Sequence, residues 1–284
     1  MPDGSPITLR EAADRLGVHY MTAYRYVRTG RLRAGRVGAH WWVDPGDLAA
    51  VSRSSAPAGR RAQGTSATAR RATLPRRLEA RLVAGDEAGA WSVVEASLGS
   101  GATPDDVLVE GIGPAMRAIG QRWEDGSYSV DDEHLASAVA LRIVSRLGAR
   151  FPRRGAKRQA VILGTPSGEL HSLPTAMAAN CLRGRGYEVV DLGGDVPAEA
   201  FAGAVAKAAR PLAVALAVTA GDHDRAVRAT VRALGQAAPD VPVLVGGAAI
   251  GSAAHAARLG ARWTGADARS LAESIDERAR NLRR

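Results

Sequence analysis

The feature that most constrains the fold is an alternation of short apolar strands and amphipathic helices between residues 160 and 245. Consecutive strands joined by helices lie parallel in one sheet, because the crossover connection needs a helix's length of chain. The pattern therefore predicts an α/β doubly wound (Rossmann-like) domain over residues 153–284, with ligands bound at the carboxyl ends of its strands. The predicted strands are residues 160–163, 188–192, 213–218 and 243–245, with helices at 174–184, 197–209 and 224–237.

The loops at those strand ends are the candidate site, and the first of them contains Glu169 and His171. A histidine here can present one ring nitrogen to a metal while a nearby carboxylate holds the other. A histidine hydrogen-bonded to solvent or backbone is the other interpretation. The four loops are residues 164–174, 193–197, 219–223 and 246–247.

A helical bundle is predicted before the α/β domain, over residues 75–152. Apolar residues recur at helical spacing in four stretches, which are separated at glycines. The preceding segment, residues 54–74, is rich in Ser, Ala, Gly and Arg without apolar periodicity, and this predicts a flexible linker. The four predicted helices are residues 75–84, 86–99, 103–123 and 129–151.

The positive charge of the chain is concentrated at its N-terminus. Residues 1–77 hold 14 arginines against five acidic residues, whereas residues 78–284 hold 24 basic and 24 acidic residues. Residues 1–53 predict two short helices, a small hairpin around Gly38 and a further short helix from Pro45. A basic helical module attached to a neutral remainder is typical of a nucleic-acid-binding protein.

Apolar runs, the N-terminal residues and the cysteine count indicate where in the cell the protein is expected. No apolar run approaches the roughly 20 residues of a membrane span, and Met1–Thr8 lacks the features of a secretory signal. The single cysteine, Cys181, excludes an internal disulfide framework. We therefore expect a soluble cytoplasmic protein.

The run from Thr8 to Val18, followed by the segments 22–25, 30–32 and 36–38, resembles the excisionase-like branch of the MerR winged helix-turn-helix family. The alternative is a small helical dimerisation domain with surface arginines. The resemblance implies that the second helix and the wing contact operator DNA. The residues it assigns to DNA are Thr22, Tyr24, Arg25, Arg28, Arg36 and His40.

The Glu169-x-His171 loop resembles the Asp-x-His-x-x-Gly loop of cobalamin-binding domains. This resemblance implies cobalamin as the cofactor and His171 as the ligand beneath its cobalt. Two departures are Pro174, where the family has Gly, and Ala217, where it has Ser; we expect the second to cost a hydrogen bond to the cofactor's tail. The implied cofactor residues in this domain are Glu169, His171, Ser172, Leu173, Ala217, Thr219, Gly246 and Gly247.

In the bundle, Trp123 followed at a distance by Glu133-His134 resembles the light-sensing transcriptional regulators of the CarH (LitR) type. That resemblance implies adenosylcobalamin, with Trp123, Val130, Glu133 and His134 enclosing the adenosyl group. Glu124 stands where those photoreceptors commonly have a second cobalt-binding histidine. A bis-histidine photoproduct through that position is therefore not expected, and either His134 or water takes the role, or the light response differs.

The resemblances together imply a non-enzymatic regulator that binds operator DNA as a homo-oligomer, a dimer or tetramer, in the dark. Two alternatives remain at this point. One is a corrinoid methyl-carrier protein, which shares the bundle and the doubly wound domain. The other is a cobalamin-binding regulator that makes no use of light or that uses a second chromophore.

Overall fold

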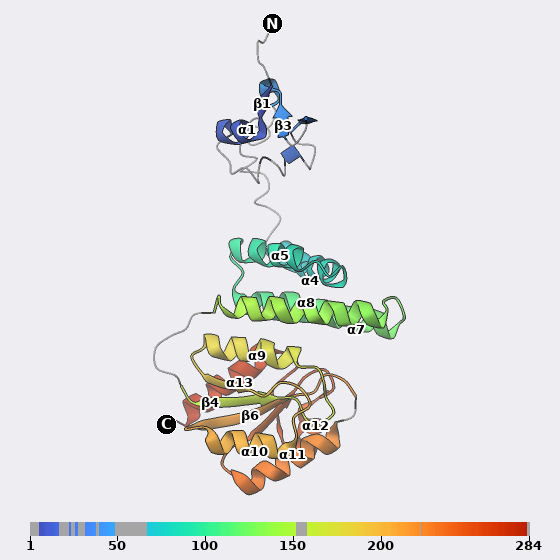
Figure 1. The fold of residues 1–284 in the computed structure, drawn as a ribbon. Helices are drawn as coiled ribbons and strands as arrows, with labels where there is room; N and C mark the ends of the chain where they lie inside the picture. The colour runs from blue at the N-terminus through green and yellow to red at the C-terminus, as the bar shows by residue number, and fades with distance from the viewer. Residues whose placement is uncertain are drawn as a thin grey trace. The chain divides into compact units, whose positions relative to one another are not determined.

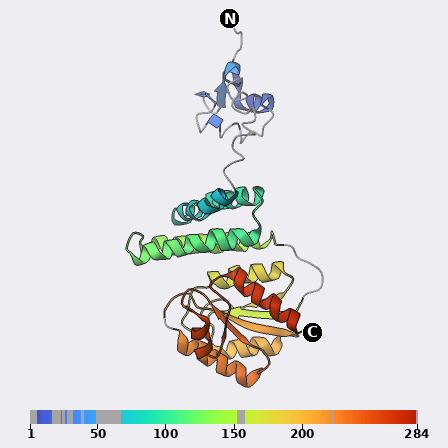
Figure 2. The same ribbon diagram turned by 180° about the vertical axis from the view of Figure 1, so that it is seen from behind.

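A computed structural model describes residues 6–16, 23, 26–27, 32–37, 40–48, 67–151, 158–221 and 223–282. The chain forms two compact units, Met1–Ser66 and Ala67–Arg284, and each has its own hydrophobic core. Figures 1 and 2 show the elements from opposite sides. Within the described ranges, no helix is long and apolar enough to cross a membrane.

The N-terminal unit is built on a small antiparallel sheet next to helix α1 (Leu9–Arg15). Thr8 caps this helix, since its side-chain oxygen accepts a hydrogen bond from the backbone nitrogen of Glu11 at 3.3 Å. The predicted hairpin is confirmed, because β2 and β3 pair antiparallel with β1 on the other side of β3. The strands are β1 (Ile7–Thr8), β2 (Gly35–Val37) and β3 (His40–Val43).

The predicted second helix, residues 20–29, is described in part. Ala23, Tyr26 and Val27 have helical backbone, and the buried Ala23 joins the core of this unit. The other residues of that segment lie outside the described residues, so the winged helix-turn-helix arrangement stays a prediction.

The bundle is present, and its first helix starts earlier than predicted. Helix α4 runs from Ala67, within the segment 54–74 that the sequence predicts as linker, and contains Pro75. Residues 67–72 have no large apolar residues at helical spacing, but they are mostly alanine and arginine, whose high helix propensity favours a helix there. The remaining helical segments are α5 (Glu87–Gly99), α6 (Pro104–Asp106), the π-helix η1 (Val107–Ile112), α7 (Gly113–Glu124) and α8 (Val130–Gly148).

Capping explains where the bundle helices begin. Thr103 and Ser129 each form a capping box, the first with Asp106 and the second with Asp132. The predicted third helix, residues 103–123, is interrupted by η1, where Gly111 allows close approach of α4: a Cβ at this position would lie 2.9 Å from Leu74. The predicted last helix is also shorter than expected and ends at Gly148.

The predicted doubly wound domain is confirmed as a parallel five-stranded sheet of order β5-β4-β6-β7-β8. Alternate residues of β4 enter opposite cores. Val161 and Leu163 lie on the side of α9 (Leu173–Gly184) and α13 (Ala268–Asn281), and Ile162 lies on the side of α10 (Ala198–Lys207) and α11 (Asp224–Ala237). Figures 1 and 2 show helices on both faces of the sheet. The strands are β4 (Ala160–Gly164), β5 (Glu188–Asp191), β6 (Pro211–Ala217), β7 (Val243–Gly246) and β8 (Arg262–Trp263).

Beyond residue 245, the structure contains three elements that were not predicted from the sequence: α12, β8 and α13. Helix α13 was missed because it is highly charged, although Ala272, Ile275 and Ala279 are buried at helical spacing. The helices of this domain are α9 (Leu173–Gly184), α10 (Ala198–Lys207), α11 (Asp224–Ala237), α12 (Ala253–Arg258) and α13 (Ala268–Asn281).

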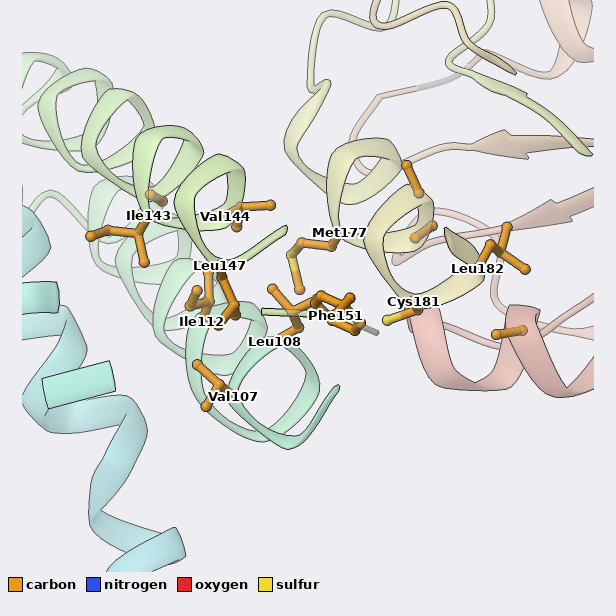
Figure 3. Packing of buried hydrophobic residues seen from close by; sticks show 14 of the residues in the cluster. Val107, Leu108, Ile112, Ile143, Val144, Leu147, Phe151, Met177, Cys181 and Leu182 are labelled. Carbon is orange, nitrogen blue, oxygen red and sulfur yellow. The ribbon is translucent and has the colours of Figure 1, made fainter. Parts of the chain in front are cut away.

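The bundle packs against helix α9 (Figure 3). The side-chain nitrogen of Asn180 donates to the backbone oxygen of Val144 at 2.8 Å, and Gly148 lies directly against Asn180. Met177 packs near Gly113 at the start of α7. Burial raises the pKa of the neighbouring Cys181 thiol, so this cysteine is a packing residue and not a nucleophile.

Candidate functional site

The first strand-to-helix loop holds His171 through the carboxylate of Glu169. Atom Oε1 of Glu169 lies 2.5 Å from Nδ1 of His171 and accepts the backbone N–H of the same residue at 3.0 Å. A carboxylate oxygen is an acceptor, so in the neutral imidazole Nδ1 carries the proton and Nε2 has the lone pair. The His171 side chain is 51% exposed, which leaves Nε2 available to a ligand above the loop.

Glu169 also ties this loop to the next strand. Its Oε2 accepts the backbone N–H groups of Thr219 at 2.7 Å and Ala220 at 3.1 Å. Burial by itself raises the pKa of Glu169, but hydrogen bonds from the backbones of His171, Ala220 and Thr219 and from the imidazole outweigh it and hold the pKa below its usual value. The carboxylate is therefore ionised at neutral pH and favours the ring orientation that directs Nε2 outward.

Two residues that the sequence analysis did not single out shape the same loop. Asp195 has a left-handed backbone (φ 54°), and its side chain accepts the backbone N–H of Gly168 at 2.7 Å. The hydroxyl of the buried Thr165 donates to the backbone oxygen of Glu169 and accepts from the backbone of Asp195 at 3.0 Å. The segment 193–197 was predicted as part of the site, but these roles depend on contacts between distant parts of the chain.

A second part of the candidate site is formed by small residues at the ends of β6 and β7. Ala217 and Gly246 are partners in the sheet, and a Cβ on Gly246 would lie 2.5 Å from the backbone oxygen of Gly265. Gly247 has φ +108°, and a Cβ there would overlap the backbone oxygen of Val218. Thr219 adds a buried Oγ1 that has no hydrogen-bond partner within the described part of the chain.

Ser172 and Leu173 connect the histidine loop to α9. Ser172 precedes the helix, and Leu173 is its first residue, partly buried against the bundle core. Beside them, the side chain of Leu170 is 73% exposed. An apolar side chain that is exposed next to His171 suits contact with an apolar ligand, and its position between Glu169 and His171 could have indicated this from the sequence.

The bundle extends beyond α9 on the side of this loop. Gly148 packs against Asn180 and Phe151 against Gly184, so α8 and α9 run in the same direction. Continuing this register along both helices, the part of α8 that precedes Leu141 extends past Leu173, the first residue of α9, by about 15 Å. The row of α8 that faces α9 at Gly148 comprises Val130, His134, Ser137, Leu141 and Val144.

The four predicted bundle residues lie on this overhanging end. Trp123 and Val130 are apolar and exposed, by 46% and 55%. Glu133 accepts a hydrogen bond from Ser137 at 2.7 Å, and Nδ1 of His134 lies 2.9 Å from the backbone oxygen of Val130. Among the described residues, no hydrogen bond or ion pair joins these four to Glu169 or His171. The structure thus groups the predicted residues into two sets.

The predicted DNA contacts are mostly outside the described residues. This holds for Thr22, Tyr24, Arg25 and Arg28. Arg36 lies exposed in β2, and the backbone of His40 begins β3. Their roles stay predictions.

Three segments of the chain match known domains. Residues 74–147 and 159–277 each match a B12 binding domain, and residues 7–53 match a Helix-turn-helix domain. The chain carries B12-binding domains behind a helix-turn-helix domain. The B12-binding matches coincide with the bundle and with the sheet whose strand ends bear Glu169 and His171.

The relatives fall into two groups. The chain is 40% identical over 147 residues to the HTH-type transcriptional repressor CarH of Myxococcus xanthus, covering 51% of this chain and 46% of the relative. It is 31% identical over 120 residues to Trimethylamine corrinoid protein 1 of Methanosarcina acetivorans, covering 41% and 55%. The chain thus spans about half the length of the curated relatives it matches.

A solved structure supports the fold alone. The monomethylamine corrinoid protein of Methanosarcina barkeri superposes with a TM-score of 0.62 at 19% identity, covering 70% of this chain and 95% of that one. Its likeness extends to a helical bundle attached to a parallel sheet, as in residues 67–282 here.

The residues present fit a cobalamin. The macrocycle brings its own ligands to cobalt, so the protein needs to add one imidazole, which His171 offers with its Nδ1 already bonded to Glu169. Gly246 and Gly247 let the end of β7 pack directly against the backbones of Gly265 and Val218, and the unpartnered Thr219 Oγ1 can donate to a group bound at these strand ends. Both matched domains and the corrinoid relatives support cobalamin binding.

Replacing Gly247 with Ala should weaken cobalamin binding by about tenfold, because the new Cβ overlaps the Val218 carbonyl and the backbone φ is unfavourable, a strain of order 1–3 kcal/mol. Gly251→Ala is the matched control, since a Cβ there meets nothing within 4 Å. Titration of each variant with hydroxocobalamin, followed by absorbance, measures the difference. Equal affinities for the two variants would contradict a close backbone approach at Gly247.

Proposed function

We propose that this chain is a cobalamin-dependent transcriptional regulator that binds operator DNA and changes its assembly with the state of its cofactor. The observation that carries the proposal is one chain joining a helix-turn-helix match at residues 7–53 to a histidine loop held by Glu169. The relative from Myxococcus xanthus is named as an HTH-type transcriptional repressor, and its 40% identity over 147 residues supports a regulatory role for this chain.

In this proposal, the site residues contact the cofactor in two groups, one from the sheet domain and one from the bundle. His171 would hold the cobalt through its Nε2, while Ala217, Thr219, Gly246 and Gly247 would accommodate the nucleotide tail. Trp123 and Val130 would cover the upper face, with Glu133 and His134 as hydrogen-bonding partners for a polar group there.

The form of cofactor that we propose is adenosylcobalamin, and light is the proposed signal. When bound, adenosylcobalamin supplies a cobalt–carbon bond that visible light breaks. An exposed tryptophan and valine beside a hydrogen-bonding Glu-His pair suit a bulky group with an apolar base and ribose hydroxyls. Loss of that group would remove contacts beneath the overhanging end of the bundle and couple the site to oligomer assembly.

A corrinoid methyl-carrier protein is the second candidate, favoured by the likeness to the trimethylamine corrinoid proteins. The helix-turn-helix match and the arginine excess in residues 1–77 favour the regulator. Absorbance spectra of protein loaded in darkness with adenosylcobalamin, before and after illumination, test the adenosyl and light parts of the proposal. Failure of the protein to bind any cobalamin would overturn it entirely.

DNA binding should depend on residues 1–53 and fall steeply with salt. We expect the full chain to select specific duplexes from a random pool, with a log–log salt slope of roughly one unit per phosphate contact. A chain starting at residue 54 keeps the bundle and sheet cores and should lose this binding. Retention of the selected duplex by the shortened chain, measured by gel retardation, would assign another role to the N-terminal unit.

A further inference from the structure

The buried carboxylate of Glu79 on α4 binds the tip of the α7–α8 hairpin, residues 122–130, and Glu79 has no role in the proposed function. Glu79 is buried, with 4% of its surface exposed. Its Oε1 accepts a hydrogen bond from the Tyr128 hydroxyl at 3.0 Å and forms an ion pair with Arg122. Arg122 also donates to the Tyr128 hydroxyl at 3.0 Å, which closes a three-residue cluster.

The partners of Glu79 both come from the hairpin tip, far along the chain. A carboxylate removed from water is costly unless it is paired and hydrogen-bonded. Seating the tip on α4 supplies both partners at once, so a displaced tip would leave the charge of Glu79 without them. The tip itself is closed by a hydrogen bond from the backbone nitrogen of Tyr128 to the backbone oxygen of Arg122 at 2.9 Å.

The cluster is directly adjacent to the residues proposed to cover the cofactor. Trp123 follows Arg122 in α7, and Val130 begins α8 two residues after Tyr128. On α7, Arg122 points toward α4, while Trp123 lies about 100° further round the helix and shares its face with Met116, two turns earlier. Moving the tip relative to α4 therefore moves Trp123 and Val130 with it.

We infer that Glu79 is a positioning residue: through Arg122 and Tyr128 it sets the height of Trp123 and Val130 above the corrin, and so the acceptance of a bulky upper axial group. This inference rests on the proposed function. The ligand class it concerns is a cobalamin with a large organic group on its upper face, in contrast to one carrying only hydroxide or water.

The test compares two cobalamins on the full chain. Glu79→Gln should retain the affinity for hydroxocobalamin within about twofold and lose roughly tenfold in affinity for adenosylcobalamin in darkness, because only the second ligand needs the upper face. Arg122 is 45% exposed on its side chain, so water can solvate its charge in the variant and the fold should persist. Tyr128→Phe, which leaves the ion pair intact, should show a smaller change in the same direction.

Glu87→Gln is the matched control. It breaks an exposed ion pair with Arg142 (2.6 Å) in the same bundle without touching the tip. This control should bind both cobalamins like the unmodified chain. Equal losses for both cobalamins in Glu79→Gln, or no loss for either, would overturn the positioning role.

Hydrogen exchange separates this inference from the proposed function. In the cofactor-free chain, amides of residues 122–130 should exchange faster in Glu79→Gln than in Glu87→Gln, since the tip has lost its anchor. If the unmodified chain bound neither cobalamin, the proposed function would fail while the exchange result would still test the anchor. Unchanged exchange at the tip would refute the anchor whatever the cofactor.

Discussion

His171→Ala should lower the affinity for cobalamin by roughly a hundredfold and abolish the absorbance spectrum of a histidine-ligated cofactor. The reason is that His171 would supply the nitrogen that binds cobalt, whereas its neighbour Glu169 is occupied by backbone N–H groups and Leu170 is apolar. Loss of an oriented metal ligand exceeds the 10- to 100-fold typical of losing only its hydrogen-bonded partner. Titration in darkness with hydroxocobalamin measures it.

His255→Ala is the control for this experiment. His255 forms a comparable imidazole–carboxylate pair with Asp224 at 2.9 Å in the same domain, between helix α12 and the start of α11. We expect this variant to bind cobalamin normally. An unchanged histidine-ligated spectrum in His171→Ala would show that another group lies beneath the cobalt and would refute the site.

The sheet and most helices could be predicted because their information is local. Val161, Ile162 and Leu163 form a short, largely β-branched apolar run, which is typical of a strand buried on both faces. The capping residues Thr103 and Ser129 likewise mark helix starts within a few residues of sequence. The early start of α4 was missed since its first residues have no apolar stripe to indicate a helix.

The sequence could predict which residues form the candidate site, but not the hydrogen bonds that join them across the fold. A His two residues after a Glu suggests an oriented imidazole, and the structure joins them at 2.5 Å. The bonds from Thr219 and Ala220 to Glu169 bridge about fifty residues and follow from the order of strands in the sheet, which the sequence analysis did not assign. The pairing of Glu79 with Tyr128 crosses 49 residues and depends on how the bundle helices pack, which no local sequence pattern indicates.

Light should dissociate the adenosylcobalamin-bound oligomer, and Trp123→Ala should reduce this response more than it reduces hydroxocobalamin binding. Trp123 lies on the overhanging end of the bundle with 46% of its surface exposed, so its contacts are available to an upper axial group and contribute little to the fold. The bundle's opposite end is held to the sheet domain by ion pairs of Arg269 with Asp106 at 2.7 Å and with Glu110 at 3.2 Å. Loss of the adenosyl group should therefore release the end that bears Trp123 first.

Size-exclusion chromatography in darkness and after green illumination measures this response, with Leu282→Ala as a control that removes another exposed apolar side chain far along the chain. Glu124 cannot ligate cobalt as an imidazole does, and Nδ1 of His134 is bonded to the Val130 carbonyl, so Nε2 is the nitrogen through which His134 would ligate. We therefore expect the illuminated state to revert more readily than one fixed by two histidines. Identical elution in darkness and light would exclude light-driven disassembly, and it would leave the cobalamin site itself to be judged by His171→Ala.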